Sequence, residues 1–219
     1  MNHAVAGQDL FRNNQDRARF VHDLYEFNDA RPVNNLTYRF DIKGLRNPYF
    51  PEDMREKIVS IHGWCLMRDH YHLLLSEEVE NGMSLFMRKM NVGYANSFNE
   101  KYGRRGTLFQ GRTKKILIER EAHFNYILHY VHLNPLDYLE GAKEWRERNH
   151  QGILDATQAL EYLNTYRWSS YLDYTGKRNF PSILSMSIFK DVLGDYAGAL
   201  AEYLEDAEAD LASLQLLEY

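Results

Sequence analysis

The fold is decided by residues 58–76, which read IVSIHGWCLMRDHYHLLLS. Ile58–Met67 and His70–Ser76 are two runs rich in apolar and aromatic residues, and only Arg68 and Asp69 separate them. Strands joined by so short a connection form an antiparallel hairpin. This stretch therefore predicts two paired strands and a tight turn.

Helices are expected on both sides of this hairpin. Residues 14–27 before it can form a helix that Asn14 caps. Residues 83–101 after it form an amphipathic helix that ends at Gly103. The apolar side chains that recur at helical spacing in these two segments are Phe20, Leu24, Phe27, Phe86, Met90, Tyr94, Phe98 and Tyr102.

A further strand and helix follow. Lys114–Glu119 has strand character because it contains three consecutive apolar residues. A helix from about Glu121 to Leu133 should stop at Pro135, because proline disfavours helix at the residue before it. The order helix, two strands, helix, strand, helix predicts an α+β fold, in which one antiparallel sheet carries helices on one or both faces.

Two regions stand apart from this pattern. Residues 28–57 contain three prolines and are interpreted as an inserted loop, with a short strand at Leu36–Ile42. Residues 155–163 and 187–206 predict further helices in a C-terminal extension.

The composition favours a packed protein of the cytoplasm. Hydrophobic residues make up 44% of the 219 residues and charged residues 26%, so disorder is not expected. No apolar run approaches the length of a membrane span, and the N-terminus lacks the pattern of a signal peptide. Cys65 is the one cysteine, which excludes an internal disulfide; it is interpreted as a buried apolar residue, with a nucleophile as the alternative.

Charge is distributed unevenly along the chain. The net charge is −5, but residues 87–120 hold nine Lys/Arg against two acids. Residues 190–219 hold one base against eight acids. A basic middle segment is typical of nucleic-acid binding, although two solvated helix faces would give the same counts. The basic side chains expected to line a DNA groove are Arg104, Arg105, Arg112, Lys114 and Lys115.

His70 and His72 are candidate metal ligands. Side chains alternate across a strand, so residues two apart project from the same face, while Tyr71 points the other way into the core. Two imidazoles so placed can bind one divalent ion. The alternative is a half-exposed strand that carries polar histidines.

Tyr130 and Asn134 form the second candidate pair. They are four residues apart and therefore stack on one face of the helix end. The amide oxygen can complete a metal shell, and the metal can polarise a phosphate that the phenolate attacks. The alternative for Tyr130 is a packed aromatic residue. His129 and His132 fall on other faces and are expected to be surface or helix-end residues.

Four blocks in this order resemble the single-tyrosine HUH transposases, in particular the REP-associated tyrosine transposase branch of the IS200-like enzymes. The resemblance covers roughly residues 1–175. The blocks are CLMRDHYHLLL at 65–75, GTLFQGR at 106–112, YVHLNP at 130–135 and RWSSY at 167–171.

The resemblance implies a ferredoxin-like fold with the two histidines on a central strand. It implies that His70 and His72 bind Mg²⁺ or Mn²⁺ with Asn134 as third ligand, and that Tyr130 is the nucleophile. Cleavage would leave a 5′-phosphotyrosine on single-stranded DNA that carries small hairpins, and rejoining would need no ATP. Family members occur as monomers and as homodimers. The domains expected are a catalytic domain at 1–150, with an insertion at about 28–57, and a helical extension at 151–219.

The chain departs from the family pattern at two places. Arg68 and Asp69 replace the usual Pro-Asn, and Asp69 is interpreted either as a turn former or as an outer-shell carboxylate. The family's first strand, which pairs beside the histidine strand, normally begins before the point that matches Asn2. A decayed or domesticated module that binds hairpin DNA without cutting it is therefore the alternative function, and a metal hydrolase of small molecules is a third.

Overall fold

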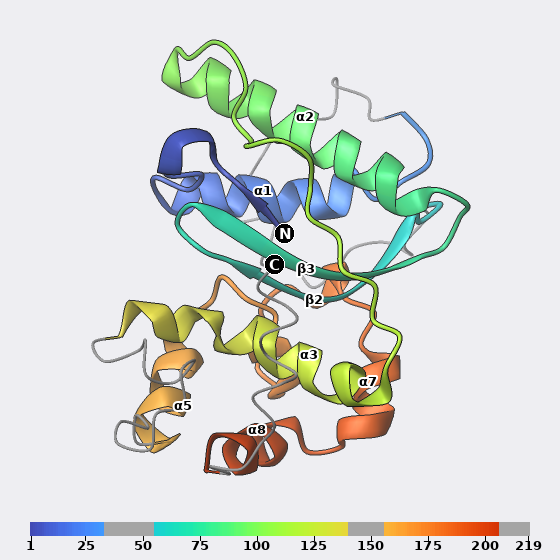
Figure 1. The fold of residues 1–219 in the computed structure, drawn as a ribbon, viewed down its shortest axis with the longest axis vertical. Coiled ribbons are helices and arrows are strands. Elements are labelled where there is room, and N and C mark those ends of the chain that lie inside the picture. Colours follow the sequence, from blue (N-terminus) through green and yellow to red (C-terminus); the bar gives the residue numbers. More distant parts are fainter. Residues whose placement is uncertain (33–54, 140–155, 206–219) are drawn as a thin grey trace.

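The computed structural model describes three stretches of the chain, residues 1–32, 55–139 and 156–205. Figure 1 shows an antiparallel sheet across the middle of the molecule, with helices packed on both of its faces. The predicted α+β class, a sheet with packed helices and a helical C-terminal part, is therefore confirmed. The boundary predicted at residue 150 lies outside the described residues and stays a prediction.

The predicted hairpin is present. It consists of β2 (Val59–Leu66) and β3 (His70–Glu77), which pair in antiparallel register. The Met67 amide donates to the His70 carbonyl at 2.9 Å and closes the turn.

A third, short strand makes β3 the central one. β1 (Asn2–His3) runs antiparallel to β3, with Asn2 opposite Tyr71 and His3 opposite His70. The order of strands is thus β1-β3-β2. Among the described residues no strand lies beside the rest of the outer edge of β3, because β1 spans only two residues.

The strand predicted at Lys114–Glu119 is wrong. The chain contacts the N-terminal segment at the sheet edge through Leu108 and Lys114 instead. The Val5 amide donates to the Leu108 carbonyl, and the Lys114 amide donates to the Met1 carbonyl. After Lys114 the segment is irregular. Its apolar side chains misled the pattern because they are not packed in a sheet; Leu117 is 78% exposed.

Two helices cover one face of the sheet, α1 (Asn14–Glu26) and α2 (Gly82–Tyr102) (Figure 1). Both were predicted within one residue at each end. Aromatic side chains fill the space beneath them: the Phe20 ring centre lies 4.8 Å from that of Tyr71 and 5.0 Å from that of Tyr94. All three rings are buried.

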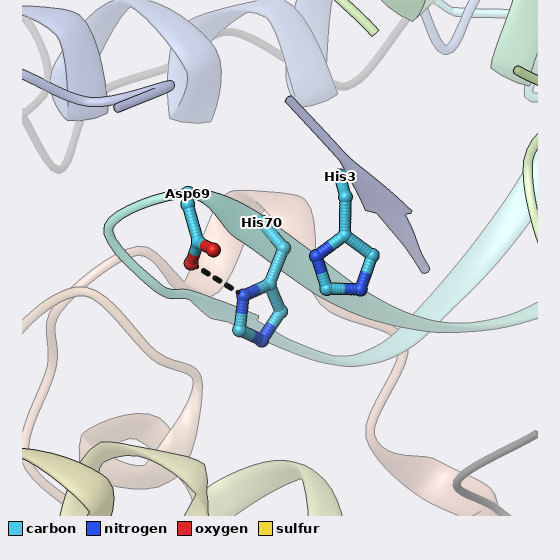
Figure 2. A group of neighbouring side chains, drawn as sticks. All are labelled: His3, Asp69 and His70. Carbon is cyan, nitrogen blue, oxygen red and sulfur yellow. Dashed lines mark hydrogen bonds and ion pairs between the residues drawn. The ribbon is translucent and has the colours of Figure 1, made fainter. Parts of the chain in front are cut away.

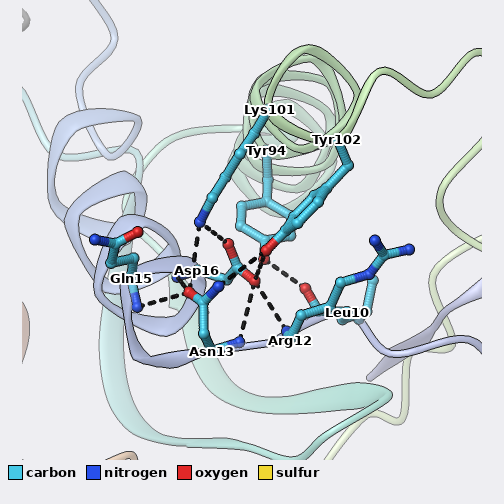
Figure 3. A network of polar contacts seen from close by, with 8 residues as sticks. All are labelled: Leu10, Arg12, Asn13, Gln15, Asp16, Tyr94, Lys101 and Tyr102. Carbon is cyan, nitrogen blue, oxygen red and sulfur yellow. Dashed lines mark hydrogen bonds and ion pairs between the residues drawn. The ribbon is translucent and has the colours of Figure 1, made fainter.

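Asn13, and not the predicted Asn14, caps α1. The Asn13 side chain accepts from the Asp16 amide, and the Asp16 carboxylate accepts from the Asn13 amide, which is a capping box. Asn14 could not form one, because Arg17 follows it at the required spacing. Figure 3 shows that Asp16 also accepts from Lys101 at 2.6 Å, so the start of α1 is fastened to the end of α2.

The opposite face is covered by α3 (Glu121–Leu133), which ends where predicted. The chain continues as a 3-10 turn, Asn134–Tyr138, with Pro135 at its beginning. This turn keeps Asn134 aligned with the helix that precedes it.

The C-terminal helices pack around α3 (Figure 1). The helix predicted at 155–163 is α5, and the single helix predicted at 187–206 is wrong, because Gly194 with φ 54° interrupts it. The remaining elements are α5 (Ala156–Thr165), α6 (Tyr171–Tyr174), α7 (Ser187–Leu193), α8 (Tyr196–Glu205) and the 3-10 turns Val5–Gly7 and Pro181–Ile183.

Several predictions lie outside the described residues. These are most of the insertion at 28–57, the strand at Leu36–Ile42 and the acidic end of the chain after residue 205. Within the described part, no helix combines the length and the apolar character needed to cross a bilayer.

Candidate active site

The two histidines of β3 lie on the same face of the sheet, as their spacing predicts. Their ring centres are 5.0 Å apart and the rings are nearly perpendicular. Tyr71 between them points into the opposite core, where its hydroxyl donates to the Asn91 side-chain oxygen at 2.7 Å. The two imidazoles therefore face the side that α3 covers.

Tyr130 is the side chain of α3 that meets this pair. Its ring centre lies 5.5 Å from that of His72 in an edge-to-face contact. Only 6% of Tyr130 is exposed, and the same holds for His72. The tertiary structure thus brings a phenol beside the histidine pair, across the space between sheet and helix.

Asn134 lies one helical turn beyond Tyr130 and is fully buried. Its side-chain nitrogen donates to the Tyr130 carbonyl at 2.7 Å, which fixes the plane of the amide. This hydrogen bond holds the Asn134 side chain against the last turn of α3, and the predicted stacking of the Tyr130 and Asn134 side chains stays a prediction.

Tyr126 is the neighbouring tyrosine on the same side of α3. Its ring packs against Tyr203 of α8, with centres 5.3 Å apart, and lies 6.3 Å from the Tyr130 ring. Tyr126 thus faces the C-terminal helices. Of the two, only Tyr130 is in ring contact with His72 among the described aromatic pairs.

A cavity of about 670 Å³ opens beside Tyr130 and His72. It lies along the part of β3 that β1 does not reach, and residues 113–118 of the connection to α3 form part of its wall. Its walls are mainly apolar. They come from β3 (Leu73–Glu77), α2 (Met83, Met87), the connection 113–118, α3 (Phe124, Ile127, Val131) and α7 (Ile188, Phe189).

The five predicted DNA-binding residues lie along the connection between α2 and α3, which crosses the molecule in Figure 1. Lys114 and Lys115 line the cavity, and Lys115 donates to the Ser84 hydroxyl at 3.0 Å. Arg105 and Arg112 are exposed. Arg104 is held at the end of α2 by a 2.7 Å hydrogen bond to Asn99.

His3 is a site neighbour that the sequence did not reveal. It is opposite His70 in the pairing of β1 with β3, and the two ring centres are 4.6 Å apart. Figure 2 shows the two imidazoles side by side, with the Asp69 carboxylate hydrogen-bonded to His70 Nδ1 at 2.8 Å. Candidate ligand atoms of these three residues all lie within 4.8 Å of one another. Only knowledge of the strand register could have predicted this group.

Two members of this group have shifted pKa values. Burial works against the charge of Asp69, but the hydrogen bond and charge of His70 leave the pKa of Asp69 below its usual value. Burial, together with the nearby charge of His70, lowers the pKa of His3.

Arg68, the other departure in the turn, points away from the histidines. It is 68% exposed and forms an ion pair with Asp9 at 3.2 Å. Its amide donates to the Tyr138 hydroxyl, which ties the turn to the segment after α3. Of the two interpretations of Asp69, its contact with His70 supports the outer-shell carboxylate.

The expectation that His129 and His132 are surface residues is wrong. His132 is fully buried, with Nδ1 2.7 Å from the Tyr196 hydroxyl and Nε2 2.7 Å from the Ser170 hydroxyl. His129 stacks on Tyr196 and Tyr203. The helices that follow α3 in sequence cover these faces, so position at a helix end did not imply exposure.

Residues 44–134 match the family model described as Transposase IS200 like. The matched stretch contains the hairpin, α2, the basic connection and α3, and with them His70, His72, Tyr130 and Asn134. This region is similar to the IS200-like transposase family. Comparison with curated proteins and with solved structures gave no match. The predicted resemblance is confirmed, and it supports a transposase role with DNA as partner.

The donors present fit the divalent ion that the transposase family suggests. Two imidazoles on one sheet face supply nitrogen, and the Asn134 amide offers oxygen one turn after Tyr130. Mixed nitrogen and oxygen sets suit Mn²⁺ and related ions, whereas Mg²⁺ prefers oxygen.

Proposed function

We propose that this transposase cleaves and rejoins single-stranded, hairpin-bearing DNA through a covalent link to Tyr130. The observation that carries the proposal is the ring contact between Tyr130 and His72, at the mouth of a cavity that two lysines also line. A phenol, an imidazole pair and positive charge meet there, as phosphodiester cleavage by a tyrosine requires. DNA is the proposed partner and the cytoplasm the proposed compartment.

His70, His72 and Asn134 would hold the ion, Mg²⁺ or Mn²⁺. Bound there, a divalent ion withdraws charge from a phosphate and favours the ionised form of a nearby phenol. The Tyr130 oxygen attacks the phosphorus, a phosphorus–oxygen bond forms, and the bond to the 3′ oxygen breaks. The phenol proton passes to solvent, the leaving 3′ oxygen takes a proton from solvent, and the products are a 5′-phosphotyrosine and a free 3′-hydroxyl. Attack by a 3′-hydroxyl reverses these changes and rejoins the strand.

The cavity and the connection from α2 to α3 are the proposed path for the substrate. The cavity walls are apolar and aromatic, as in sites on which unpaired bases stack. Lys114 and Lys115 at its rim, and Arg105 and Arg112 before them, offer positive charge to the phosphates. The single strand would thus follow the connection from α2 towards Tyr130.

The test is incubation of the purified protein with a labelled hairpin-bearing oligonucleotide and Mn²⁺. We expect a covalent protein–DNA adduct that survives denaturing electrophoresis and disappears with EDTA. Binding without an adduct would support the alternative of a non-cutting hairpin-binding module. Absence of both binding and cleavage would contradict the proposal. Sedimentation of the same sample tests whether the protein is a monomer or a homodimer.

The basic connection yields a prediction about salt. Replacing both Lys114 and Lys115 with Gln should weaken oligonucleotide binding and lower the slope of log affinity against log salt by about 1.4, since each lost single-strand phosphate contact removes about 0.7. Fluorescence anisotropy over a range of salt concentrations measures the slope.

The matched control is Lys177→Gln with Arg178→Gln. These two exposed residues follow α6 and carry the same total charge as the lysine pair. The control should leave the slope unchanged. Equal loss of slope in both double variants would mean that net charge, and not the proposed groove, governs binding.

A further inference from the structure

The metal centre proposed above contains two imidazoles, but the structure places a third beside them. His3 and His70 are directly opposite in adjacent strands, and His72 follows His70 on the same face. Side chains opposite each other in an antiparallel pair share a face of the sheet. Three imidazoles therefore gather on one face, with His70 in the middle.

Their spacing suits a common ion. Imidazoles at adjacent corners of one ion have ring centres about 4.5 Å apart, because metal–nitrogen bonds are about 2.1 Å long. The ring centres of His3 and His70 are 4.6 Å apart, and those of His70 and His72 are 5.0 Å apart. The first distance matches this value and the second is slightly longer, and the candidate ligand atoms of His3 and His70 already lie within 4.8 Å of one another.

Asp69 orients the middle imidazole. Its carboxylate is hydrogen-bonded to His70 Nδ1 at 2.8 Å (Figure 2). With the proton held on Nδ1, Nε2 presents its lone pair to an ion, an arrangement found at many metal-binding histidines. The Asp69 side chain is 41% exposed, so this end of the group is in contact with solvent.

We infer that His3 is a further ligand of the divalent ion beside His70 and His72, and that Asp69 is a positioning residue for His70. The inference rests on the proposed function and deepens it. A third imidazole weakens the preference of the site for Mg²⁺, which takes oxygen ligands, relative to transition-metal ions, of which Mn²⁺ binds nitrogen least tightly. The short strand β1 would then belong to the active site as well as to the sheet.

The experiment measures Mn²⁺ binding to the full chain without DNA. Titration followed by electron paramagnetic resonance gives affinity, and electron spin echo modulation counts the imidazole nitrogens on the ion. The wild type should show three, and His3→Gln should show two, with affinity reduced about 10-fold or more. His3→Gln should also lower the ratio of the affinity for Mn²⁺ to the affinity for Mg²⁺. Asp69→Asn should weaken binding but keep three nitrogens.

His123→Gln is the control, because this histidine lies at the start of α3, away from β1. It should change neither affinity nor nitrogen count, and thermal melting of every variant checks folding. The role of His3 would be overturned if the wild type showed two nitrogens, His3→Gln bound Mn²⁺ as tightly as the wild type, and His72→Gln bound it more weakly. That result would leave the proposed function standing. No Mn²⁺ binding by the wild type, or none lost in His72→Gln, would overturn both.

Discussion

Tyr130→Phe abolishes formation of the covalent DNA adduct, and strand cleavage falls by a factor on the order of 10³ or more. The substitution removes only the phenol oxygen, which is the proposed nucleophile. The ring still fills its place in the core and keeps its edge-to-face contact with His72, so folding and oligonucleotide affinity should barely change. Gel analysis of the adduct and anisotropy measure the two effects separately.

Tyr126→Phe is the matched control. Tyr126 lies one turn earlier on the same helix and is buried to a similar degree, but its ring packs against Tyr203. This variant should retain cleavage. Mass spectrometry of the trapped adduct should map the modified peptide to Tyr130. An adduct on Tyr126, or cleavage that survives in Tyr130→Phe, would contradict the assignment of the nucleophile.

His132→Ala should lower the free energy of unfolding by about 3 kcal/mol or more. The imidazole is fully buried and joins α3 to Ser170 and to Tyr196 of α8 through hydrogen bonds at both ring nitrogens. Its removal leaves a cavity, and the buried hydroxyls of Ser170 and Tyr196 each lose a hydrogen-bond partner. Because Tyr130 lies on the same helix, the adduct yield should fall as well. Urea denaturation measures the stability change.

His123→Ala is the control for this prediction, since His123 lies at the partly exposed start of α3. It should cost less than about 1 kcal/mol, as is usual for surface substitutions. If His132→Ala costs no more than the control, the buried hydrogen-bond network does not fasten the C-terminal helices to α3.

The pH dependence of the same experiment gives a second readout. Burial lowers the pKa of His132 well below its ordinary value of 6.5. The folded state therefore keeps this imidazole neutral, while the unfolded state takes up a proton below pH 6.5. Stability of the wild type is lost as pH falls through this range, by up to about 1.4 kcal/mol per pH unit for one histidine. The variant lacks this loss, so the stability gap between the two should narrow towards acid pH.

Much of this protein follows from local sequence. The alternation of His70, Tyr71 and His72 fixes which side chains share a face, because a strand has a period of two residues. The spacing of Tyr130 and Asn134 fixes their stacking in the same way, because it approximates one helical turn. Ordered motifs identified the family before any contact was known.

Other features depend on which segments meet, and only the tertiary structure decided these. His3 comes beside His70 through the register of two strands far apart in sequence, and His132 is buried because helices after residue 156 close over α3. Lys114–Glu119 shows the converse: apolar residues suited to a strand remain irregular because no neighbouring strand pairs with them in the described residues. Periodicity specifies the face that a side chain occupies within its own element, whereas burial and pairing depend on the surface that another element brings to it.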